Sequence, residues 1–279
     1  MLRVWLALAM TIPALITAVT LVVTSGGAQK SSQSVPSTMG RAASLPQLQL
    51  NRGPASEPSS LGSASFDSGS ALSEGDTTLA MRDVGYQPKE EVYLADPSNY
   101  DQRVAVDSQG TPVDNDYIVV LHETVGDVVS AINTFQTPHP NDDDQVSYHA
   151  LIALDGTVIY IVPPEQRAFG AGNSVFVSPK GEESVSTNAE FASSVNNFAY
   201  HISLETPPDG QLNDNSMHSG YTEAQYRSLA WLISRSTIPE DRITTHREID
   251  RSGSRADPRS FEPERLVRLL RQYRGQAEN

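Results

Sequence analysis

The chain has 279 residues, of which 38% are hydrophobic, so it is long enough to bury a substantial core. Its formal net charge of −14 argues against nucleic acid and anionic lipid as partners, because both are bound by clustered Lys and Arg. Cysteine is absent, which excludes disulfides and excludes thiolate as a metal ligand or nucleophile.

Residues 1–28 have the pattern of an export signal. The almost wholly apolar stretch 4–23 follows Arg3, and the small residues before Ala28 are typical of a cleavage site. The same stretch is about long enough to cross a bilayer, so an uncleaved membrane anchor is the alternative. In either case we expect export, to the periplasm or the cell envelope.

Residues 29–83 are dominated by Ser, Gly, Pro and Ala and contain few large apolar side chains. Such a segment cannot bury enough surface to offset the entropy of ordering it, so we expect a disordered linker. The folded part is therefore expected at residues 84–274, as a single domain.

Within that part, strand and helix patterns alternate. Residues 118–121 form a continuous β-branched and apolar run, typical of a strand buried on both faces. The next segment, 125–135, has helical spacing and predicts an apolar stripe through Val128, Val129, Ile132 and Phe135. Residues 148–162 predict a hairpin with its turn at Asp155-Gly156.

Strand and helix patterns also alternate in the rest of the chain. Residues 200–205 alternate as a strand, a helix capped by Thr222 follows, and the last helix begins at Pro263. Because strands interleave with helices, the expected fold class is α/β.

Two of the six histidines close strand patterns. His122 ends the first buried strand, and His246 ends the run 243–245 and is followed by Asp257-Pro258. Imidazole and carboxylate are the ligands of a catalytic zinc, which keeps one position for water. We therefore predict that these two histidines and Asp257 bind Zn²⁺, although each taken alone is compatible with a structural role.

A base and a supporting phenol are expected near that site. Glu205 ends a strand just before a turn, where it could take a proton from a metal-bound water; a solvated surface carboxylate is the alternative. Tyr148 and His149 must point to opposite faces, and we expect Tyr148 at the cleft and His149 packed structurally. His139 and His218 are expected to be exposed loop residues.

Six short motifs together resemble the zinc N-acetylmuramoyl-L-alanine amidases, the family that includes the peptidoglycan recognition proteins. In chain order they are Leu121-His122-Glu123-Thr124, Ser147-Tyr148-His149, Asp155-Gly156-Thr157-Val158, Ile202-Ser203-Leu204-Glu205, Tyr221-Thr222-Glu223-Ala224-Gln225 and His246 to Asp257-Pro258. The resemblance implies a mixed central β-sheet flanked by helices, with His122, His246 and Asp257 as zinc ligands. It also implies Glu205 as the base and Tyr148 as its support.

Two positions depart from the family pattern. Arg255 stands where members commonly have Lys to stabilise the oxyanion, so the charge is kept but its geometry changes. In the segment 168–173, Phe169 replaces a Trp and Gly170 stands where a substrate-contacting His is expected. The resemblance therefore implies a lost substrate hydrogen bond at Gly170.

The expected function is hydrolysis of the amide between N-acetylmuramic acid and L-alanine in peptidoglycan, with muramyl peptides as the partner. The alternatives are a peptidoglycan-binding module of the same fold that does not cut, and a structural envelope protein. The sequence does not indicate the preferred stem peptide, the physiological role or the oligomeric state.

Overall fold

The computed structural model describes residues 85–277. The expected export signal or anchor at 1–28 and the expected linker at 29–83 lie outside the described residues. Within 85–277, no helix is both long enough and apolar enough to cross a membrane.

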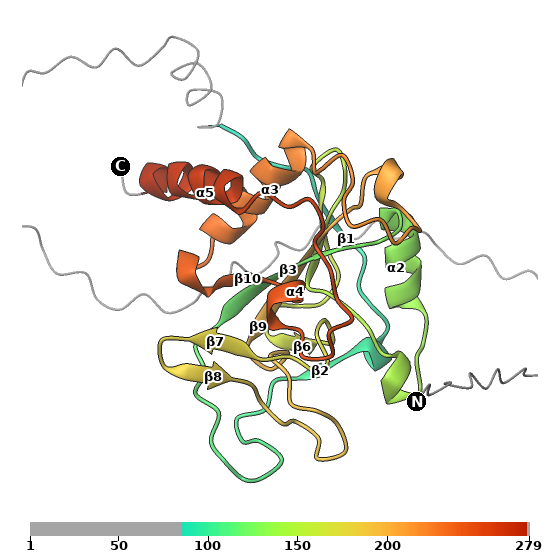
Figure 1. Ribbon diagram of the computed structural model, residues 1–279, viewed down its shortest axis with the longest axis vertical. Helices are drawn as coiled ribbons and strands as arrows, with labels where there is room; N and C mark the ends of the chain where they lie inside the picture. Colours follow the sequence, from blue (N-terminus) through green and yellow to red (C-terminus); the bar gives the residue numbers. More distant parts are fainter. Residues whose placement is uncertain (1–84, 278–279) are drawn as a thin grey trace, which may run out of the picture. The chain divides into compact units, whose positions relative to one another are not determined.

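A mixed β-sheet lies at the centre of the fold (Figure 1). Its six strands, counted over residues 85–277, are β1 (Glu90–Val92), β3 (Ile118–Glu123), β4 (Ala150–Ile152), β5 (Val158–Tyr160), β9 (Ala199–Leu204) and β10 (Ile243–Thr245). Their order is β1-β5-β4-β9-β3-β10, and all neighbours are parallel except the β4–β5 hairpin. The expected α/β class and mixed sheet are therefore confirmed.

Smaller elements surround this sheet. Two antiparallel pairs are β2 (Tyr100–Gln102) with β6 (Gln166–Ala168), and β7 (Phe176–Ser178) with β8 (Gly181–Glu183). The α-helices are α2 (Val128–Gln136), α3 (Glu223–Ser234), α4 (His246–Ile249) and α5 (Pro263–Ala277). Short 3₁₀ turns are η1 (Pro97–Asn99), η2 (Asp142–Asp144), η3 (Pro208–Gly210) and η4 (Glu240–Arg242).

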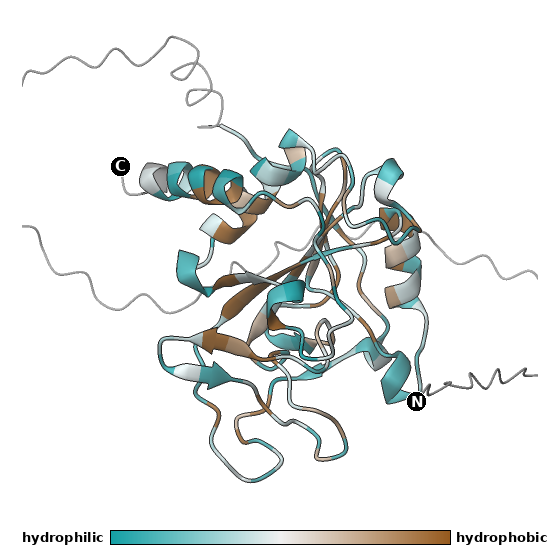
Figure 2. Cartoon of the chain, viewed as in Figure 1, coloured by the Kyte–Doolittle hydropathy of each residue, from teal (hydrophilic) through white to brown (hydrophobic). Residues whose placement is uncertain are grey.

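The sheet is buried on both faces, and the two faces differ. Side chains of β3, β4, β5 and β9 on one face pack with the apolar sides of α3 and α5. On the opposite face, Ile118 and Val120 pack against Phe176 and Ile249, and Leu151 packs in a separate cluster that includes α2. Figure 2 shows the hydrophobic residues concentrated in the strands of the sheet. Because side chains alternate along a strand, His122 shares the second face with Ile118 and Val120, as expected.

Local signals explain several element boundaries. Thr222 caps α3 in a reciprocal capping box with Gln225, as predicted. Gly156 has a φ of +88° in the β4–β5 turn, and a Cβ there would lie 2.9 Å from the carbonyl oxygen of Ala224. Glycine is therefore required where this turn meets the start of α3.

The helix expected over 125–135 begins later than the pattern indicates. Val125 has a φ of 60°, which no helix accepts, and the Asp127 side chain caps the helix by accepting from the Ser130 N–H. Val129 was expected in the buried stripe but is 61% exposed, so that assignment is wrong. Val128 and Ile132 are partly buried and pack with the buried Phe135, so the apolar side of α2 does not include Val129.

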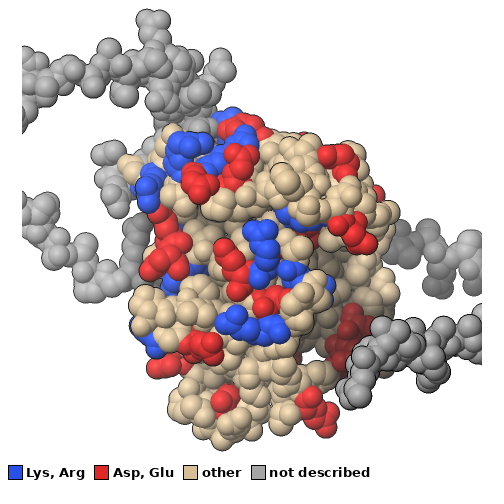
Figure 3. Space-filling view, in the orientation of Figure 1, with Lys and Arg blue, Asp and Glu red and all other residues tan. Residues whose placement is uncertain are grey.

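Charged residues of both signs lie side by side over α3 and α5 (Figure 3). Arg265 pairs with Glu223 and Glu262, and Arg271 pairs with Glu240 of η4. Arg271 is 69% exposed, so water screens its pair and the contribution to stability is small.

Candidate metal centre

His122 is the fifth residue of β3 and is completely buried. Its strand lies between β9 and β10 and all six residues of the strand are buried, so the imidazole lies in the interior. Its Nδ1 atom is buried and has no hydrogen-bond partner within residues 85–277. A buried nitrogen without such a partner is costly, and a metal ion would satisfy it.

His246 reaches the same place from the neighbouring strand. β10 runs parallel to β3 with Thr245 opposite Leu121, and Thr245 then caps the short helix α4, which His246 begins. This strand-to-helix turn brings the two imidazoles together, with ring centroids 4.6 Å apart. The parallel register of β3 and β10 is therefore what pairs the two histidines.

Asp257 completes the group from the loop after α4. Its Oδ2 lies 3.3 Å from Nδ1 of His122, and its Oδ1 lies 3.1 Å from Nδ1 of His246. The Asp257 carbonyl oxygen also accepts a hydrogen bond from the N–H of Arg247, at 2.9 Å, which ties the loop to α4. One ligand atom from each of the three residues lies within 4.8 Å of the other two.

The protonation states of this group suit a divalent cation. Burial lowers the pKa of His122 to about 4, so its imidazole is neutral at physiological pH. Burial raises the pKa of Asp257, but contacts with His122 and His246 outweigh it and hold that pKa far below its usual range. Two imidazole nitrogens and one carboxylate, facing one another, match the donor set of a catalytic zinc site.

Tyr148 joins the predicted ligands. Its ring stacks on His122 with the centroids 4.3 Å apart, and the edge of Phe135 from α2 supports it from another side. Burial raises the pKa of the Tyr148 phenol, so the hydroxyl stays protonated. Tyr148 can therefore donate a hydrogen bond at this site, whereas its action as a base would require an unfavourable ionisation.

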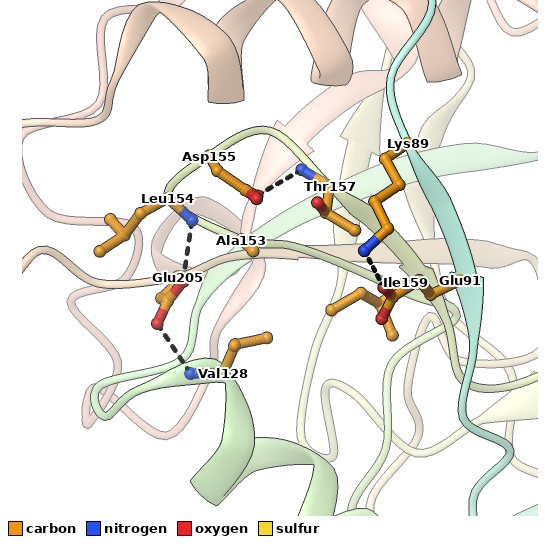
Figure 4. A pocket seen from close by; sticks show the side chains of 9 residues that line it. All are labelled: Lys89, Glu91, Val128, Ala153, Leu154, Asp155, Thr157, Ile159 and Glu205. Carbon is orange, nitrogen blue, oxygen red and sulfur yellow. Dashed lines mark hydrogen bonds and ion pairs between the residues drawn. The ribbon is translucent and has the colours of Figure 1, made fainter.

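The Glu205 side chain lies between Val128 and Leu154 (Figure 4). Its Oε1 accepts from the N–H of Val128 at 3.0 Å, and its Oε2 accepts from the N–H of Leu154 at 2.8 Å. It lines a pocket of about 360 Å³ that also includes Lys89 and Asp155. The carboxylate thus ties the start of α2 to the β4–β5 turn, and it is not part of the three-residue ligand group.

Arg255 lies on the exposed loop that precedes Asp257. Its backbone N–H donates to Oδ2 of Asp250 at 3.1 Å, one of several bonds by which Asp250 shapes this loop. Burial is the main cause that lowers the pKa of His122, and the Arg255 charge adds a minor part in the same direction. The role of Arg255 at the oxyanion stays a prediction.

The sequence interpretation missed two residues of β9. His201 lies beside His122, with 2.9 Å between Nδ1 of His201 and Nε2 of His122. Ser203 is directly opposite His122 in the strand register, and its Oγ is buried with no hydrogen-bond partner in the described part of the chain. Alternation along residues 200–205 places both on one face, but only the sheet topology shows that this face adjoins His122.

His149 has the structural role that the sequence predicts. Its Nδ1 accepts the backbone N–H of His201 at 2.9 Å, and its Nε2 lies 3.2 Å from the carbonyl oxygen of Gln166. Burial holds the pKa values of both His149 and His201 well below 6.5, so both imidazoles are neutral. The backbone N–H of His149 also donates to the carbonyl oxygen of His201, so His149 and His201 are held together by two hydrogen bonds.

The expectation that His218 is exposed is wrong. Its imidazole is completely buried, and its Nε2 lies 3.1 Å from Oε2 of Glu123 at the end of β3. Arg259 and Tyr221 bind the same carboxylate. Glu123 and Arg259 are distant from His218 in the chain, so a local pattern cannot reveal this cluster.

His139 was also expected to be exposed, but it is partly buried. Its Nδ1 lies 2.8 Å from Oδ1 of Asn99, within hydrogen-bond distance.

Comparison with known proteins identifies one family. Residues 110–260 match the family described as N-acetylmuramoyl-L-alanine amidase. A comparison with curated proteins finds no match.

Solved structures with a similar fold include a selenomethionine derivative of AmpD, which is 24% identical, with a TM-score of 0.45, over 67% of this chain and 97% of its own. AmiD from E. coli, in complex with the substrate anhydro-N-acetylmuramic acid-L-Ala-D-gamma-Glu-L-Lys, is 20% identical, with a TM-score of 0.41, over 59% of this chain and 65% of its own. AmpDH3 from Pseudomonas aeruginosa, in complex with anhydromuramic pentapeptide, is 18% identical, with a TM-score of 0.39, over 60% and 66%.

Proposed function

Because this chain belongs to the N-acetylmuramoyl-L-alanine amidase family, we propose that it hydrolyses the amide bond between N-acetylmuramic acid and L-alanine in peptidoglycan, using zinc. The observation that carries the proposal is the convergence of His122, His246 and Asp257 from three separate segments, with their ligand atoms within 4.8 Å. A fold rarely brings two imidazoles and a carboxylate together at one buried point unless they bind a cation.

The donor atoms of the three residues are those that zinc prefers, and the residues would contribute differently to binding it. When bound, zinc supplies Lewis acidity to the scissile carbonyl and to the attacking water. His122 and His246 would present Nδ1 to the metal, while Asp257 would provide the negative charge. Burial keeps His122 neutral, so one of its two ring nitrogens has a lone pair available to a metal.

Tyr148 and Arg255 are the residues that we propose to act on the substrate. The protonated Tyr148 hydroxyl can donate to the oxygen that becomes negative as the carbonyl is attacked. Arg255, on the exposed loop before Asp257, would supply a positive charge to the same oxygen. Glu205 is the predicted base, but both of its oxygens accept backbone N–H bonds, so its contacts favour a structural role.

Product analysis tests the proposed reaction. Purified protein with zinc is incubated with peptidoglycan, and new amino termini on L-alanine are measured by mass spectrometry. We expect them with the native protein and not with His122→Ala. Their absence from the native digest contradicts the proposal, and tight binding of peptidoglycan without cleavage would instead identify a binding module.

We also propose that the protein works outside the cytoplasm, in the periplasm or cell envelope. The apolar stretch 4–23 and the small residues before Ala28 support export, by a cleaved signal or an uncleaved membrane tether. Sequencing the N-terminus of the protein from cell fractions distinguishes these forms. An intact Met1 in the cytosolic fraction would contradict both.

A further inference from the structure

The imidazole of His201 is the immediate neighbour of the proposed metal ligand His122. Both side chains are completely buried, their ring centroids are 5.1 Å apart, and Nδ1 of His201 lies 2.9 Å from Nε2 of His122. Because β9 and β3 are adjacent parallel strands, this contact is built into the centre of the sheet.

The hydrogen positions in this pair follow from the metal centre. A neutral imidazole carries one N–H and one lone pair. If Nδ1 of His122 presents its lone pair toward Asp257 and a metal, Nε2 must carry the hydrogen, and Nδ1 of His201 is the atom that accepts it. His201 then has its own hydrogen on Nε2, which has no hydrogen-bond partner within residues 85–277.

Gly170 provides the space for the His201 ring. A Cβ at position 170 would lie 2.6 Å from both Cγ and Nδ1 of His201, so any other residue would push the ring away. The imidazole of His201 therefore occupies the space beside Gly170, the position where the family pattern has a histidine. The backbone of His201 is also held, because its N–H donates to Nδ1 of His149.

We propose that His201 is a positioning residue that accepts a hydrogen bond from His122 and thereby presents Nδ1 of His122 to the metal. Metal-binding histidines commonly donate their second N–H to a carboxylate, a carbonyl or water, and these partners fix tautomer and ring orientation. Here the imidazole of His201 is that hydrogen-bond partner, and the absence of a side chain at Gly170 leaves space for its ring. The inference rests on the zinc centre of the proposed function, but not on its hydrolytic activity.

Zinc affinity is the readout, measured by competition with a chromogenic chelator, together with urea unfolding of the metal-free protein. His201→Leu removes the acceptor and is expected to weaken zinc binding about 10- to 100-fold. His201→Asn keeps an acceptor, because Oδ1 can take the place of Nδ1, and is expected to bind zinc about as tightly as the native protein. His139→Leu, at a histidine bonded to Asn99, is the matched control and should leave zinc affinity unchanged.

A second arm uses Gly170→Ala, which displaces the His201 ring without altering it. We expect weaker zinc binding in the native background and no further weakening when His201 is replaced by Ala, because the space is then free. This arm decides the question even if His201→Leu does not fold.

The outcomes separate the inference from the proposed activity. Native zinc affinity in His201→Leu, or equal losses in the Leu and Asn variants, would overturn the positioning role. No zinc uptake by the native protein would overturn the metal centre itself. Zinc binding that responds to His201 in a protein unable to cleave peptidoglycan would support the inference and contradict only the activity.

Discussion

At the scale of single residues, Tyr148 offers a direct test of the chemistry. Tyr148→Phe keeps the ring that stacks on His122 and removes only the hydroxyl. Loss of one donor to a developing oxyanion typically lowers kcat by about 100- to 1000-fold, and we expect an effect of that order. Zinc affinity should not change. Tyr160→Phe, whose hydroxyl bonds Glu90, is the control and should retain kcat; an equal kcat in both variants would argue against a role for Tyr148.

Glu205→Gln separates the predicted base from a structural anchor. In the variant, an amide NH₂ must face the N–H of Val128 or Leu154, and one buried donor loses its acceptor. We expect the free energy of unfolding to fall by about 1–3 kcal/mol, with little change in kcat of the folded enzyme. Urea unfolding and steady-state kinetics measure both. A large loss of kcat at native stability would instead identify Glu205 as the base.

At the scale of elements, Arg259 joins the end of β3 to two loops. Its guanidinium binds Glu123 and the carbonyl oxygens of Gly210 and Asn215, and both charged side chains are almost fully buried. Arg259→Ala leaves the Glu123 charge buried, so we expect a loss of about 3–5 kcal/mol in unfolding free energy. Arg271→Ala removes an exposed arginine and should cost less than about 1 kcal/mol. Similar losses in the two variants would contradict this difference.

A second ion pair makes stability depend on pH. Arg242 at the end of η4 binds both oxygens of Glu183 in β8, each at 3.0 Å. These bonds lower the pKa of Glu183 from 4.5 to about 2, against the opposing effect of burial. The carboxylate therefore stabilises the fold above its unfolded pKa, and this contribution is lost as the pH falls toward 2.

The measurement is the unfolding free energy of native protein and Glu183→Gln across this range. We expect the native protein to be the more stable near neutral pH, and the difference to shrink as the solution is acidified. A difference that stays constant with pH would mean that the ion pair is not the cause.

At the scale of the whole molecule, zinc should stabilise a domain that is already folded. The sheet has apolar clusters on both faces and does not depend on the metal for its core. A ligand at 100 times its Kd adds about 2.7 kcal/mol to the unfolding free energy. We therefore expect chelation to lower Tm without unfolding the domain at room temperature. Zinc should not raise the Tm of His122→Ala, and an equal rise in both proteins would indicate binding elsewhere.

Local patterns were sufficient for the central strands β3, β4, β5 and β9 and for the helices α3 and α5. The buried strand ending at His122, the turn at Gly156 and the capped start of α3 depend on neighbours within a few residues, and such neighbours are visible in a sequence. Hydrophobic spacing predicts that α2 begins at Val125. The helix begins at Val128 instead, because the backbone at Val125 has a φ of 60°, outside the helical region.

The sequence by itself determined the α/β class and named the three residues that meet at the proposed metal centre, because strand ends, turn residues and helix caps are encoded locally. Only the tertiary structure decided which side chains surround that centre. The contact of His201 with His122 and the bonds of Glu205 to backbone N–H groups depend on which strands and turns are neighbours. Strand order is set by packing between segments far apart in the chain, so side-chain neighbours across the sheet cannot be read from either segment alone.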